Sequence, residues 1–203
     1  MDAALRTGIA VYNAGHYHAA HDAWEDEWLA LEAGRDERLL HGLIQFTAAV
    51  HHARDRNWAG TVGLAESASE YLAGLPADYR GVSVEAARSY LAALARDPER
   101  VERAAPPALS YEGRALGLDD LDAPAGVEAA VVLAEHAGYD TDVFERGAEY
   151  ARDGLADGEL NEFGVLLCDF VTEREQRALV ATRLGQHVQR RKQREDDVAG
   201  LFD

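Results

Sequence analysis

The sequence predicts an all-α protein, with an N-terminal antiparallel bundle of about five helices and a C-terminal helical extension. Two patterns indicate this fold class. Apolar residues recur every three or four positions through most of the chain, which is the spacing of one helix face. Glycine and proline interrupt these runs at intervals that fit helices of ordinary length. We expect the bundle at residues 1–104, a linker at 105–125 and the extension at 126–203.

The first three helices of the bundle are marked by their ends. Asn13-Ala14-Gly15 stops a helix that begins at Asp2, since glycine readily adopts the left-handed conformation that follows a helix. Gly34 ends the second helix, and Asp36 is expected to cap the third. These helices are expected at residues 2–13, 17–33 and 37–56.

Proline marks the end of the bundle. Pro76 stops the fourth helix, and Pro98 follows a fifth helix that Ser83 caps. The segment Pro106-Pro107 and the glycines after it read as linker, with only a weak signal for a short strand between Leu109 and Leu118. The later helices are expected at residues 58–75, 84–96, 127–137, 140–155, 161–171 and 173–197.

Charge is the strongest signal in the composition. The chain has 37 acidic and 20 basic residues, a net charge of −17, and Lys192 is its single lysine. Spread along the chain, this pattern is typical of a cytoplasmic protein adapted to molar salt, and an ordinary acidic protein is the alternative. A charge of this sign disfavours nucleic acid as a partner. No apolar run reaches the roughly 18 residues of a membrane span, so we expect no membrane partner.

The third helix combines an apolar surface with one polar stripe. Leucine, isoleucine, phenylalanine and valine surround most of it, so we expect it to be buried. His41, Gln45 and His52 lie along the stripe. The preceding helix carries His21 and Glu25 on one face, and the short connection makes the two helices antiparallel neighbours. We therefore expect these polar groups to meet in a buried seam.

This seam has two interpretations. His21, Glu25 and His52 could bind a divalent metal such as zinc, with Gln45 orienting a ligand and Trp28 beside the site. In the other interpretation, the same groups only hydrogen-bond one another as a satisfied polar core. The His-Asp-Ala-Trp-Glu spacing differs from the HExxH metalloprotease motif. We expect the other histidines of this region, including His18, to lie loosely on the surface.

Residues 12–75 contain four motifs in a fixed order: Asn13-x-Gly15-x-Tyr17, His21-x-x-Trp24-Glu25-x-x-Trp28, Leu43-Ile44-Gln45 and His52-x-Arg54-x-x-Asn57. With these motifs the region resembles the domain-of-unknown-function 309 family, in the form of a halophilic archaeal member with a C-terminal helical extension. Asp22 stands where the family often has glutamate, and Trp24 replaces a more usual aliphatic residue. The resemblance implies a small all-helical fold and supplies no established activity.

Two functions from different classes follow. The first is a metal- or small-molecule-binding helical protein whose ligand and reaction the sequence does not name. The second is a noncatalytic interaction or oligomerisation module, including a homo-oligomer, in which the seam is structural. Phosphate-binding loops, dinucleotide fingerprints and nucleophile elbows are missing from the sequence. Arg54 could bind an anion, although pairing with a carboxylate is the expected role of such a residue.

Overall fold

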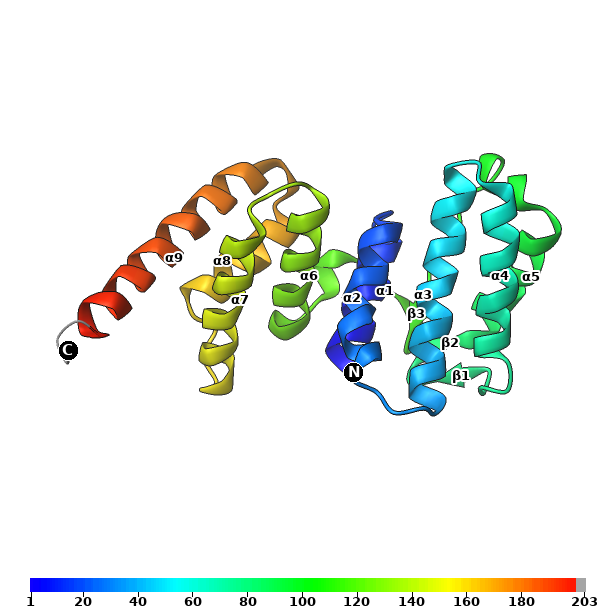
Figure 1. Ribbon diagram of the computed structural model, residues 1–203, viewed down its shortest axis with the longest axis horizontal. Helices are drawn as coiled ribbons and strands as arrows, with labels where there is room; N and C mark the ends of the chain where they lie inside the picture. Colours follow the sequence, from blue (N-terminus) through cyan, green and yellow to red (C-terminus); the bar gives the residue numbers. More distant parts are fainter. Residues whose placement is uncertain (200–203) are drawn as a thin grey trace. The chain divides into compact units, whose positions relative to one another are not determined.

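The computed structural model describes residues 1–199, and the last four positions of the predicted extension lie outside the described residues (Figure 1). The chain divides into two compact units, Met1–Leu121 and Asp122–Asp203. Both consist mainly of α-helices, which confirms the predicted all-α class with a C-terminal helical extension. None of the described helices is long and apolar enough to cross a bilayer.

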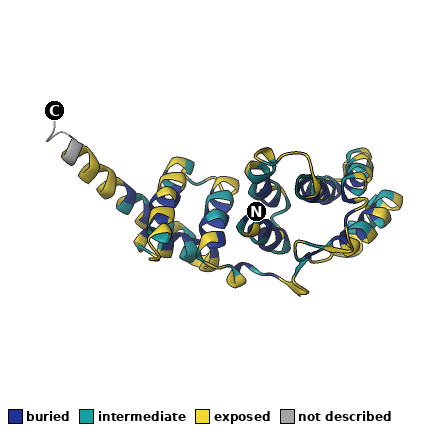
Figure 2. Cartoon of the chain, turned by 90° about the horizontal axis from the view of Figure 1, so that it is seen from below, coloured by how far each residue is buried: buried dark blue, intermediate teal, exposed yellow. Residues whose placement is uncertain are grey.

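Five helices form the first unit. In each unit the helices turn their buried faces toward one another (Figure 2). Helix α2 packs against α1 and α3, and α4 packs against α3 and α5. The first and fifth helices have the predicted bounds, whereas the second ends four residues early. The helices are α1 (Asp2–Asn13), α2 (Tyr17–Leu29), α3 (Arg35–Arg54), α4 (Trp58–Leu72) and α5 (Val84–Arg96).

Trp24 anchors α2 to the core. Its side chain is fully buried, and a Cβ atom added at Gly8 of α1 would lie only 2.1 Å from Trp24 Cε2. The glycine therefore lets the indole lie directly on the backbone of α1. The indole nitrogen has no hydrogen-bond partner. Close packing of the ring is what holds α2 in this rotation.

The predicted capping role of Asp36 is wrong. Gly34 occupies the N-cap position, and α3 begins two residues earlier than expected. Asp36 instead accepts two hydrogen bonds from Arg80, at 2.9 Å from Nε and 2.5 Å from Nη2, and a third from the Tyr79 hydroxyl at 2.7 Å. The Arg80 guanidinium, and after it the Tyr79 hydrogen bond, keeps the pKa of Asp36 below its ordinary value.

Two short hairpins form a four-stranded antiparallel sheet in the order β1-β2-β3-β4. Each hairpin turns through two residues with positive φ: Arg80 (51°) with Gly81 (80°), and Glu112 (49°) with Gly113 (77°). This pair of conformations defines the type I′ turn, whose twist matches that of the strands it joins. The strands are β1 (Asp78–Tyr79), β2 (Val82–Ser83), β3 (Ser110–Tyr111) and β4 (Arg114–Ala115).

The segment expected to be a linker packs against α1 up to Leu121. Asn13 Nδ2 donates to the carbonyls of Leu109 and Leu116, at 2.9 and 2.8 Å, and its Oδ1 accepts from the Leu109 amide. The Tyr12 hydroxyl donates to the Pro107 carbonyl at 3.0 Å. These bonds satisfy backbone groups that an open linker would leave to water. The short 3-10 helix η1 (Pro98–Glu102) precedes this segment, and a second one, η2 (Leu118–Asp120), lies within it.

The second unit, as far as residue 199, is a bundle of four helices. Phe144 of α7 and Phe170 of α8 pack edge to face at 4.6 Å, and Tyr139 contacts both rings. Side-chain oxygens of Asp122, Asp140 and Asn161 cap α6, α7 and α8. The helices are α6 (Ala123–His136), α7 (Thr141–Ala156), α8 (Glu162–Thr172) and α9 (Arg177–Ala199), with η3 (Arg174–Gln176) before the last.

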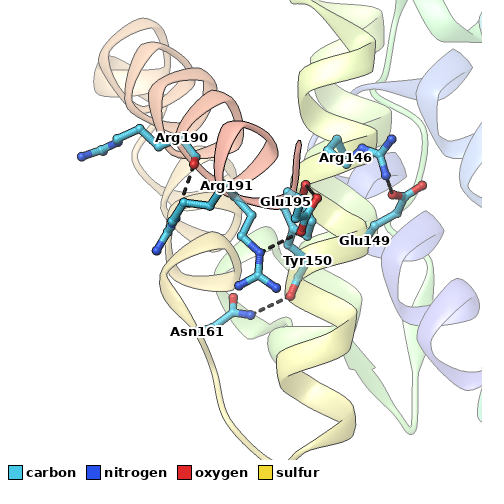
Figure 3. A network of polar contacts seen from close by, with 8 residues as sticks. Arg146, Glu149, Tyr150, Asn161, Arg190, Arg191 and Glu195 are labelled. Atoms are coloured by element: carbon cyan, nitrogen blue, oxygen red, sulfur yellow. Dashed lines mark hydrogen bonds and ion pairs between the residues drawn. The ribbon is translucent and has the colours of Figure 1, made fainter. Parts of the chain in front are cut away.

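A polar clamp holds the second half of α9 to α7 (Figure 3). Glu195 accepts a hydrogen bond from the Tyr150 hydroxyl at 2.8 Å and another from Arg191 Nε at 2.8 Å. The Arg191 guanidinium lies 5.4 Å from the centre of the Tyr150 ring. Val188 is the last buried apolar residue described on α9. Beyond it, these polar contacts hold the helix against α7.

Changing Gly8 to alanine tests the packing of Trp24. The new methyl group would overlap the indole, so we expect the free energy of unfolding to fall by about 1–3 kcal/mol. The matched control is Gly63→Ala, since Gly63 is exposed in α4 and has open space around its Cα. That change should stabilise the protein by about 0.5–1 kcal/mol. Chemical denaturation measures both, and equal effects would contradict the close contact.

Changing Asp36 to asparagine tests the ion pair between Asp36 and Arg80. The folded-state pKa of Asp36 is lowered, so its contribution is present above the unfolded pKa of about 3.9 and is lost as pH falls through the folded value. We expect a loss of about 1 kcal/mol at neutral pH, discounted for solvent screening. The difference from wild type should close as the pH falls below about 4. Asp26→Asn, on an exposed position, is the control. If the stability difference between this variant and the wild type stays constant with pH, the ion pair does not contribute as expected.

Candidate functional site

The polar groups of α2 and α3 form two clusters at opposite ends of the antiparallel helix pair. The first, the Trp28 cluster, consists of Trp28, Glu37, His41 and Tyr71. Trp28 Nε1 donates to Glu37 Oε1 at 3.0 Å, and His41 Nδ1 lies 3.4 Å from the same oxygen. The His41 ring stacks on Tyr71 at 3.7 Å and contacts Trp28 at 4.5 Å. This cluster joins α2, α3 and α4, and Glu37 already pairs with both the Trp28 indole and the His41 imidazole.

The second cluster, the His21 cluster, consists of His18, His21, Asp22 and Glu25 of α2 with His51 of α3. His21 Nε2 lies 3.8 Å from Glu25 Oε1, and His18 Nδ1 lies 3.4 Å from Asp22 Oδ2. The His18 ring stacks on His21 at 6.1 Å and meets His51 edge to face at 5.6 Å. Three imidazoles and two carboxylates therefore gather at one end of the helix pair.

Three residues of this cluster can offer ligand atoms to a single ion. One nitrogen of His21 and one oxygen each of Asp22 and Glu25 all lie within 4.8 Å of one another. Metal–ligand bonds of about 2.1 Å require neighbouring ligand atoms to approach one another more closely than this. The side chains are half-exposed, so rotation about their χ angles can supply the difference. The geometry fits an open site at the surface of α2.

His52 does not join His21 and Glu25. Its Nδ1 accepts a hydrogen bond from Asn57 Nδ2 at 2.7 Å, and Asn57 Oδ1 caps α4 by accepting from the Gly60 amide at 3.1 Å. His52 therefore belongs to the turn between α3 and α4. Its neighbour His51, about 100° around the helix, is the residue that faces α2.

The prediction that the seam is buried is wrong. The side chains of His21 and Glu25 are 32% and 47% exposed, and Gln45 and His52 are also only partly buried. The seam is split as well, since His41 pairs with Glu37 at the far end of the helix pair. The physical reason is the rotation of α2, which directs Trp24 into the core and leaves the polar face at the rim.

A sequence signal for the clusters exists at a spacing of four residues. A histidine and a carboxylate four positions apart share a helix face and can pair. This spacing identifies four residues that were not predicted to belong to the seam: Asp22, Glu37, His51 and Asp55. Four such pairs are found in the described region of α2 and α3: His18–Asp22, His21–Glu25, Glu37–His41 and His51–Asp55.

One comparison with known proteins bears on this region. The family model described as "Domain of unknown function (DUF309)" matches residues 5–64, which include both helices of the candidate site. No curated protein matches the chain.

Proposed function

We propose that this chain, whose residues 5–64 belong to the domain-of-unknown-function 309 family, binds a divalent transition metal ion at the His21 cluster. The observation that carries the proposal is the grouping of His21, Asp22 and Glu25, whose ligand atoms lie within 4.8 Å of one another. This donor set replaces the set expected from the sequence: Asp22 takes the place of His52.

The chemistry of the donors favours zinc and its neighbours in the periodic table. Imidazole nitrogen suits zinc, nickel and copper, whereas magnesium and calcium prefer sites built from oxygen alone. Three protein ligands leave at least one coordination position for water or a small molecule. The imidazoles of His18 and His51 lie beside the group, and either could accept a proton from a bound water. A metal ion here would polarise that water.

A noncatalytic helical module is the second candidate. The observation that favours it is the pairing of each histidine of the two clusters with a carboxylate on its own helix. Pairs of this kind can stabilise a helix without any ligand. In this case Leu29, which is 67% exposed at the end of α2, would be available for contact with a partner or a second copy of the chain.

We also propose that the acidic surface serves a cytoplasm of molar salt. A net charge of −17 is self-repulsive at low ionic strength, and salt screens this repulsion. We therefore expect the melting temperature to rise when potassium chloride increases from about 0.1 M to about 1 M, where the Debye length falls to about 3 Å. Scanning calorimetry measures it. A melting temperature that falls over this range would contradict the proposal.

Metal titration of untagged protein, first treated with a chelator, tests the site. We expect zinc to bind with one-to-one stoichiometry and to raise the melting temperature, because a ligand that binds only the folded state stabilises it. His21→Ala and Glu25→Gln should each weaken binding by at least about tenfold. Isothermal titration calorimetry measures the affinities.

Two control variants separate this site from its alternatives. His52→Ala should leave zinc affinity unchanged, since His52 lies in the α3–α4 turn. Glu32→Gln removes an exposed charge just beyond α2 and should also leave it unchanged. If zinc does not bind with defined stoichiometry, the noncatalytic module is the better account. If His52→Ala weakens zinc binding as much as His21→Ala, the ligand set is wrong.

A further inference from the structure

A second group of side chains in the first unit carries positive charge over aromatic rings. This tyrosine–arginine cluster consists of Tyr17, Arg54, Tyr90 and Arg100. The guanidinium carbon of Arg54 lies 5.6 Å from the centre of the Tyr17 ring, and that of Arg100 lies 5.0 Å from the centre of the Tyr90 ring. Cation–π contact of this kind orients a guanidinium without neutralising it.

Both arginines lie at the same end of the helical bundle. The final turn of α3 packs against η1, and Arg56 Nε pairs there with Glu102 Oε1 at 2.8 Å. The two tyrosines are linked by a continuous row of rings, in which neighbouring ring centres are 5.1 to 5.9 Å apart. The row runs through Tyr17, Tyr12, Phe46 and Tyr90.

Three carboxylates of this region pair with other partners. Glu102 pairs with Arg56, Asp97 with Arg103, and Asp55 with His51. Within residues 1–199, neither Arg54 nor Arg100 forms an ion pair with a carboxylate. The expected pairing of Arg54 with an acid is therefore wrong for the described chain. Two uncompensated guanidiniums are unusual in a protein with a net charge of −17.

Tyr90 adds an independent observation. Its side chain is only 7% exposed, and its hydroxyl is buried without a hydrogen-bond partner. An unpaired buried hydroxyl costs about 1–3 kcal/mol, so native structures seldom keep one. Burial raises the pKa of Tyr90, while the charge of Arg100 lowers it and Tyr17 raises it. Arg100 lies over the same ring, with its guanidinium carbon 5.0 Å from the ring centre.

We propose that the tyrosine–arginine cluster binds a small oxyanion of the phosphate class. Guanidinium groups present N–H donors in a planar fork that matches phosphate oxygens. The Tyr90 hydroxyl would donate a hydrogen bond to the same anion. A bound anion would supply both the missing charge and the missing acceptor. This site involves none of the three proposed metal ligands and stands without the proposed function.

Titration with inorganic phosphate at constant ionic strength tests the site. Amide chemical shifts of metal-free protein report binding, and we expect saturation with a dissociation constant of about 1 mM or below. Arg54→Gln and Arg100→Gln should each weaken binding by about tenfold or more. Arg35→Gln, at the opposite end of α3, is the matched control and should leave the affinity unchanged. If Arg35→Gln has the same effect as the other two changes, phosphate responds only to overall charge and the proposal fails.

Tyr90→Phe separates a ligand contact from a structural role. Because the hydroxyl has no partner in the protein, its removal should not lower the free energy of unfolding. We expect phosphate affinity to fall severalfold in this variant while thermal stability is retained. Unchanged affinity, or no saturable phosphate binding by the wild-type chain, would overturn the proposal.

Discussion

The burial of Trp24 on Gly8 is the contact on which the arrangement of the first unit depends. A helix turns about 100° per residue, so fixing one large side chain fixes the direction of every other. With Trp24 directed into the core, the four α2 residues of the His21 cluster point between about 60° and 160° away from it. That sector lies at the rim of the bundle. The same contact therefore produces both the stability of α2 and the half-exposed state of His18, His21, Asp22 and Glu25.

The helices were predictable because their signals are local. Apolar spacing and stop residues are read within one element, and α1 and α5 have the predicted bounds. The hairpins were not predictable in this way, since strands of two residues are too short to show alternation. Arg80-Gly81 and Glu112-Gly113 hold the turns, and glycine at the second position is their only clear mark. The role of Asp36 could not be predicted for the same reason. An aspartate near the start of a helix predicts a cap, whereas its partner Arg80 is distant in sequence.

The candidate site shows how a small error in helical phase changes a functional interpretation. His51 and His52 are neighbours in sequence but differ by about 100° in direction. Sequence spacing put His52 on the polar stripe with His41, yet Asn57 holds its ring in the α3–α4 turn and His51 meets His18. Only the crossing of α2 over α3 decides between the two histidines. Spacing within one helix is more dependable, since the four-residue spacing placed His21 and Glu25 together from the sequence alone.

The residues that resemble the family motif divide by their contacts into two kinds. Asn13 ties α1 to the chain around β3 and β4, and Asn57 caps α4, so both serve the fold. Tyr17, His21 and Arg54 have side chains directed to the two proposed sites. Tyr17 precedes His18 in α2, and Arg54 lies one turn after His51 in α3. The α2–α3 pair therefore carries the donors of the proposed metal site and one of the two arginines of the proposed anion site, whereas the other, Arg100, lies in η1.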